Sequence, residues 1–186
     1  MASKAMSNTE IGLKVLAWLG LVGGALGVFG GIITLLMALF MPFKALYANM
    51  PGMPPEMGEH MERLMHFEAW MILFILPLYG LGIAGGAGIL KRQGWGRGLM
   101  EAAAWYHVVL VAAGLSVLLS GAVDLGFLAP PPLPGQDPAV QAKAAQMMSM
   151  VMQVMGGAMA LVTGALSGAL LWFLRRQPTR DWFRRA

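Results

Sequence analysis

Apolar residues fill four long stretches of the chain, and charged residues are confined to the segments between them. Residues 15–43, 69–90, 102–123 and 144–174 contain no Asp, Glu, Lys or Arg. Each stretch exceeds the roughly 20 residues that an α-helix needs to cross a bilayer. Hydrocarbon offers no water to bond backbone amides, so such stretches form helices. The pattern therefore predicts an all-α membrane protein, a four-transmembrane-helix bundle.

The predicted spans set the organisation of the chain. They cover about 15–41, 68–90, 100–123 and 146–174, joined by loops at 42–67 and 124–145, within one membrane domain of residues 1–186. The first span is too long for the roughly 7–15 residues of a signal-peptide core, so we expect it to be uncleaved. Composition agrees, because 12% of residues are charged, against about 25% in soluble domains.

The distribution of Lys and Arg predicts an orientation. Basic residues crowd the segments on one side of the predicted membrane: Lys4, Lys14, Lys91, Arg92, Arg97, Arg175, Arg176, Arg180, Arg184 and Arg185. The other side has Lys44, Arg63 and Lys143. Because basic residues near span ends stay in the cytoplasm, we expect both termini there and the protein in the cytoplasmic (inner) membrane. The excess of basic residues on this side then faces anionic lipid, and no nucleic acid partner is expected although the whole chain has a net charge of +4.

The two outer loops are rich in proline, and the two halves of the chain are similar. Leu90-Lys91-Arg92-Gln93 matches Leu174-Arg175-Arg176-Gln177 at an offset of 84 residues. Asp137 before Pro138 predicts a helix N-cap. These features suggest a tandem repeat of two helical hairpins. The alternative is that short hairpins with basic inner ends share such features without duplication.

The segment Gly88–Arg97 joins the second and third predicted spans and carries two basic residues, a Trp and a further Arg. In this motif and in its overall layout, the chain resembles bacterial four-span integral membrane proteins of uncharacterised function. The resemblance implies a four-helix fold and a membrane location. It does not imply a reaction.

Small residues form lines along the predicted spans. Gly23, Gly27 and Gly31 recur every fourth residue, with Gly20 and Gly24 on an adjacent line. Such lines let another helix backbone approach closely. We expect them to pack helices within the bundle; the alternative is contact with a second copy or another membrane protein. Pro77, midway along the second span, predicts a kink there.

Methionine and histidine gather in the first outer loop. Met53, Met57, Met61 and Met65 are spaced by four, with His60 and His66 among them. Thioether and imidazole groups suit a soft cation such as Cu(I), so these six residues are the candidate metal ligands. The alternative is that methionine serves as adaptable packing and no cofactor is present. The chain has no Cys, so thiolate ligands are excluded.

His107 is the ionisable residue that lies well inside a predicted span. Such a residue is a functional candidate by default. The alternative is a neutral imidazole bonded to Ser167 or Thr163 of the fourth span. We find no catalytic set of residues, so we expect a protein that is not an enzyme and acts through helix packing or partner interaction. The alternative is transport or handling of a small cation such as Cu(I).

Overall fold

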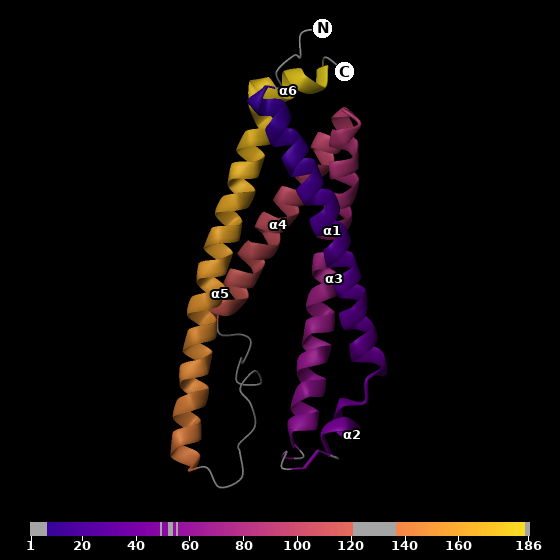
Figure 1. Ribbon diagram of the computed structural model, residues 1–186. Helices are drawn as coiled ribbons and strands as arrows, with labels where there is room; N and C mark the ends of the chain where they lie inside the picture. Colours follow the sequence, from indigo (N-terminus) through magenta and orange to yellow (C-terminus); the bar gives the residue numbers. More distant parts are fainter. Residues whose placement is uncertain (1–6, 49, 52–53, 55, 121–136, 185–186) are drawn as a thin grey trace. The chain divides into compact units, whose positions relative to one another are not determined.

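The protein is built from α-helices throughout the part of the chain that its computed structural model describes: residues 7–48, 50–51, 54, 56–120 and 137–184. The four long helices are α1 (Asn8–Phe40), α3 (Glu56–Leu90), α4 (Gly94–Ser120) and α5 (Pro138–Arg175). Two short helices, α2 (Phe43–Ala48) and α6 (Gln177–Arg184), follow α1 and α5 (Figure 1). The predicted all-α fold with four long apolar helices packed as a bundle is confirmed.

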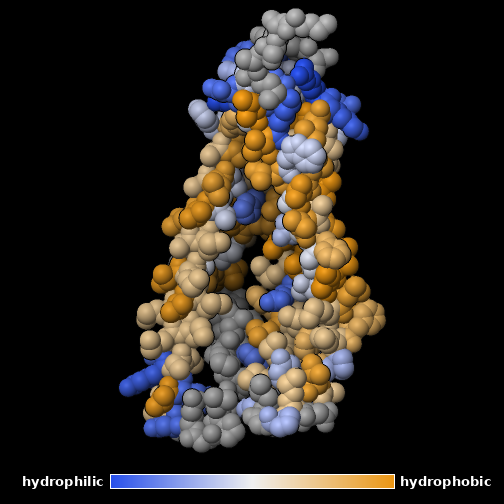
Figure 2. Space-filling model, viewed as in Figure 1, coloured by the Kyte–Doolittle hydropathy of each residue, from blue (hydrophilic) through white to orange (hydrophobic). Residues whose placement is uncertain are grey.

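All four long helices have the length and apolarity to cross a bilayer. Large apolar side chains cover their surfaces, as the orange regions of Figure 2 show. The chain is therefore a multi-pass membrane protein in contact with lipid. The 38 residues of α5 extend about 57 Å at 1.5 Å per residue, so part of this helix lies beyond the hydrocarbon.

The ends of the helices follow the local chemistry of the sequence. The Ala139 amide donates to Asp137 Oδ1 at 2.9 Å, with Pro138 at the first helical position. This confirms the predicted N-cap of α5. The α3–α4 turn is closed by Arg92, whose φ of 56° is left-handed, and by a bond from the Gln93 amide to the Gly88 carbonyl of 2.9 Å. Helix α2 lies within the predicted loop 42–67; the Pro-rich run at 130–134 lies outside the described residues.

The chain divides into two compact units, and every long helix contributes to both. The first unit contains Met1–Gly30, Phe74–Ala112 and Val162–Ala186. Its core joins Leu13, Ala17, Ile89, Met100 and Leu174, which come from α1, α3, α4 and α5. Trp182 and Phe183 of α6 pack against this core, and the buried Thr179 donates its hydroxyl to the Phe173 carbonyl at 2.8 Å.

The second unit contains Gly31–Leu73 and Ala113–Leu161. In it, α2 packs against the first turn of α3 at Gly58, where an added Cβ would lie 2.8 Å from Lys44 Cα. Lys44 Nζ donates to Glu59 Oε1 at 2.7 Å, and both side chains are more than half exposed. This hydrogen bond and the carboxylate charge raise the pKa of Lys44 above its ordinary value.

Candidate functional site

One close helix packing in the first unit joins α1 to α3 through glycine. A Cβ built on Gly20 would lie 2.6 Å from the Gly82 carbonyl oxygen, and one on Gly24 would lie 2.7 Å from the Tyr79 carbonyl oxygen. A Cβ on Gly86 would lie 2.5 Å from the Ala17 carbonyl oxygen. Because these neighbours are backbone atoms, they cannot turn aside as a flexible side chain would. The two helices therefore approach as closely as their backbones allow.

The glycine line that makes this interface is Gly20, Gly24 and Gly27. A Cβ on Gly27 would meet the Tyr79 ring at 2.5 Å, whereas one on Gly23 would have no neighbour within 4 Å. Gly31 is buried and belongs to the second unit. Of the predicted packing residues Gly23, Gly27 and Gly31, the structure thus places Gly27 at the α1–α3 interface of the first unit.

A second close approach joins the end of α3 to the start of α4. A Cβ on Gly88 would lie 2.5 Å from Gly96 Cα, and a Cβ on Gly96 would lie 2.5 Å from the carbonyl carbon of Gly88. The same crossing brings Gly85 against the Met100 side chain. The predicted inner link is consequently more than a short connection, because its glycines set the distance between two spans.

A small cavity of about 190 Å³ lies beside these contacts in the first unit. Its walls include Gly20, Gly82, Tyr79 and Met100, with His107 and Ser167 as a polar pair. His107 Nδ1 lies 2.8 Å from Ser167 Oγ. Ser167 is one of the two partners expected for the imidazole of His107. Its hydroxyl gives Nδ1 the hydrogen bond that a polar group requires in an apolar environment.

A hydrogen bond from α4 reaches α3 close to Pro77, where a kink was expected. Proline has no amide to donate to the Leu73 carbonyl, and its ring disturbs the preceding turn. The Tyr106 hydroxyl donates to the adjacent carbonyl of Phe74 at 2.7 Å. A hydroxyl from a neighbouring helix thus bonds to the backbone carbonyl next to the one that Pro77 leaves without an amide donor.

Two carboxylates connect the helix ends of the first unit. Glu10 Oε1 lies 3.2 Å from Lys14 Nζ and 3.0 Å from Arg92 Nη2. Glu101 lies between Arg97 Nε, at 3.4 Å, and Arg175 Nε, at 3.2 Å. The pairs four residues apart on one helix follow from the sequence spacing, but the bonds to Arg92 and Arg175 depend on the fold. Sequence reasoning had assigned these two acids no role.

The candidate metal ligands lie at the start of α3, except Met53, which is outside the described residues. His60 is buried, Met57, Met61 and Met65 are half-buried, and His66 is exposed. Within the described residues, no group of three or more His, Cys, Asp or Glu is placed to hold a metal ion. Any cation site here therefore depends on the Met thioethers. Helix α5 carries further methionines that are exposed: Met147, Met148, Met150, Met152, Met155 and Met159.

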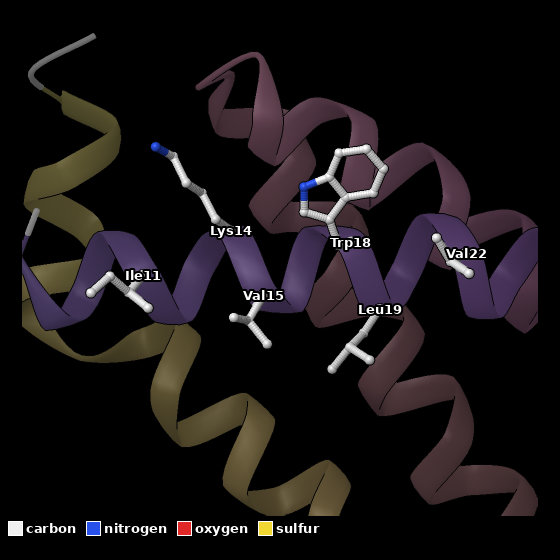
Figure 3. A pocket seen from close by; sticks show the side chains of 6 residues that line it. All are labelled: Ile11, Lys14, Val15, Trp18, Leu19 and Val22. Carbon is white, nitrogen blue, oxygen red and sulfur yellow. The ribbon is translucent and has the colours of Figure 1, made fainter.

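A shallow surface pocket of about 480 Å³ runs along α1 (Figure 3). It is lined by Lys14 and by five apolar residues, Ile11, Val15, Trp18, Leu19 and Val22. All six residues belong to one helix, and four of the apolar five are more than half exposed. In a bilayer this surface meets acyl chains, so it carries no argument for a specific ligand.

Comparisons with protein-family models, with curated proteins and with solved structures found no match. The assignment as a multi-pass membrane protein therefore rests on the length and apolarity of the four long helices. Any function has to be inferred from the packing and chemistry described above.

Proposed function

We propose that this protein is not an enzyme and acts in the membrane through helix packing or contact with a partner. The observation that carries the proposal is the backbone-to-backbone approach of α1, α3 and α4 at Gly20, Gly82, Gly88 and Gly96. Small residues that allow such contact are the usual means by which membrane helices associate. Because Lys and Arg are concentrated on one side, we propose that the protein lies in the cytoplasmic membrane with both termini in the cytoplasm.

The contacts of the glycine line favour packing within one chain over packing between copies. Gly20, Gly24 and Gly27 all face atoms of α3. A groove that is already occupied by a neighbouring helix of its own chain is closed to a second copy. Partner contacts would then use the exposed apolar surfaces of the helices.

Replacement of Gly27 by alanine tests this assignment. We expect Gly27→Ala to lower the free energy of unfolding by about 1 kcal/mol, because the Tyr79 ring has to shift. Gly23→Ala, which adds a Cβ into open space, should be neutral or stabilising by up to about 1 kcal/mol. Unfolding in detergent and the molar mass of the complex by light scattering would be measured together. A changed oligomeric state in Gly27→Ala at unchanged stability would contradict packing within the chain.

A second candidate is the handling of Cu(I) or another soft cation by the first turns of α3. The observation favouring it is that Met57 lies one helical turn from both His60 and Met61, at spacings of three and four, with His60 buried. A thioether–imidazole set of this kind suits Cu(I).

Titration with Cu(I) separates the two candidates. If the α3 residues bind the cation, the purified protein should take it up stoichiometrically, and Met57→Leu with Met61→Leu and Met65→Leu should abolish uptake. The matched control replaces Met147, Met150 and Met155 of α5, which are exposed, and should retain uptake. Absence of uptake by the unaltered protein would eliminate the cation proposal. Under helix packing alone, both triple variants behave like the parent.

A further inference from the structure

Helix α6 presents its apolar side to the protein and its basic side outward. Trp182 and Phe183 pack on the core of the first unit, and Thr179 is fully buried. Arg180 and Arg184 are exposed and one helical turn apart, and Arg176 precedes Arg180 by four residues. Because its apolar face is already covered by protein, α6 holds its arginines in a defined place.

Positive charge exceeds negative charge at this end of the first unit. Its described basic residues are Lys14, Lys91, Arg92, Arg97, Arg175, Arg176, Arg180 and Arg184, and its described acids are Glu10, Glu101 and Asp181. Glu10 pairs with Lys14 and Arg92, and Glu101 pairs with Arg97 and Arg175. Among the residues that the structure describes, no carboxylate lies within ion-pair distance of the other four basic residues: Lys91, Arg176, Arg180 and Arg184. We name the three of these that lie on α6 or directly before it, Arg176, Arg180 and Arg184, the α6 basic surface.

Tryptophans connect this surface to the lipid-facing sides of the helices. Arg176 lies over the Trp172 ring at 5.7 Å, and Arg175 lies over the Trp105 ring at 5.8 Å. Trp172 is 68% exposed and Trp105 is 48% exposed. Trp is enriched at the headgroup level of membrane helices, so we place Trp172, Trp105 and the guanidinium groups over them at that level. In Figure 2 the hydrophilic residues around α6 adjoin the apolar surface of the helices.

We propose that the α6 basic surface binds the headgroup phosphates of anionic phospholipids. The anion nearest to a cation at headgroup level is a lipid phosphate. Each basic residue at a membrane surface raises the affinity for anionic lipid about fivefold. Arginine suits this role because its planar donors match phosphate oxygens. The inference goes beyond the proposed function, since helix packing does not require it.

The test uses the full chain in a non-ionic detergent, with dioleoylphosphatidylglycerol or dioleoylphosphatidylcholine added. Native mass spectrometry counts the lipids retained on each molecule. We expect the parent to retain phosphatidylglycerol in preference to phosphatidylcholine. The double variant Arg180→Gln with Arg184→Gln should bind phosphatidylglycerol with about 25-fold lower affinity, because each of the two cations contributes about fivefold. Arg180→Lys with Arg184→Lys should keep most of the preference, because the charge remains.

The matched control removes two exposed basic residues of the second unit, Arg63→Gln with Lys143→Gln. This variant should retain phosphatidylglycerol like the parent. Circular dichroism of all variants checks that the helices persist. Equal retention of the two lipids by the parent, or equal retention of phosphatidylglycerol by the Arg180→Gln, Arg184→Gln variant, would overturn the proposal. The proposal would also be overturned if the protein showed no lipid preference but bound a short DNA duplex through the two arginines.

Discussion

Among substitutions of glycine by alanine at the helix crossings of the first unit, Gly96→Ala should cause the largest loss of stability. The new Cβ would lie 2.5 Å from both the Gly88 carbonyl carbon and the Ile89 amide nitrogen. Both neighbours are backbone, so α3 and α4 have to separate. We expect a loss of about 3 kcal/mol in the free energy of unfolding, at the upper end of overpacking costs. Chemical unfolding in detergent, followed by circular dichroism, would measure it.

Gly98→Ala is the control for this prediction. It lies two residues further along α4 and has no neighbour within 4 Å of an added Cβ. Alanine is the better helix former, so the free energy of unfolding of this variant should equal that of the parent or exceed it by up to about 1 kcal/mol. If both variants lost stability equally, the Gly88–Gly96 contact would not be the cause of the loss.

Glu101→Gln should cause the second largest loss. The carboxylate lies between Arg97 and Arg175 and is 17% exposed, so its removal leaves two neighbouring cations without their counterion. Breaking a fully buried pair costs about 3–5 kcal/mol. The two arginines are partly exposed and are solvated in the variant, so we expect about 2 kcal/mol. Thermal unfolding at low and high salt would measure the loss, which salt should reduce.

Glu59→Gln provides the contrast. It breaks the hydrogen bond to Lys44, but both partners are more than half exposed. Exposed ion pairs contribute little, so no measurable change in stability is expected. A loss in Glu59→Gln as large as in Glu101→Gln would show that burial between two helices is not what makes the Glu101 pair important.

The four long helices could be predicted because lipid imposes a strict requirement on length and apolarity. The α5 N-cap followed from Asp137 and Pro138, and Ser167 was one of the two residues named as possible partners of His107. These features depend on local chemistry or on position along one span. They need no knowledge of which helix faces which.

The packing register could not be predicted in the same way. Gly20, Gly23, Gly24, Gly27 and Gly31 form two adjacent lines on α1, and choosing between them requires the crossing angle with α3. The bond from Tyr106 to Phe74 and the pair of Glu101 with Arg175 likewise join residues on different helices. Hydropathy carries no information about such pairings.

The division of the chain into two compact units has a consequence for protein fragments. The boundaries fall at residues 30–31, 73–74, 112–113 and 161–162, each within a long helix. A cut in the α3–α4 turn would leave every long helix whole, yet each fragment would hold parts of both units and all of neither. If the two hairpins arose by duplication, the ancestral single hairpin would have needed a second copy of itself to complete either unit.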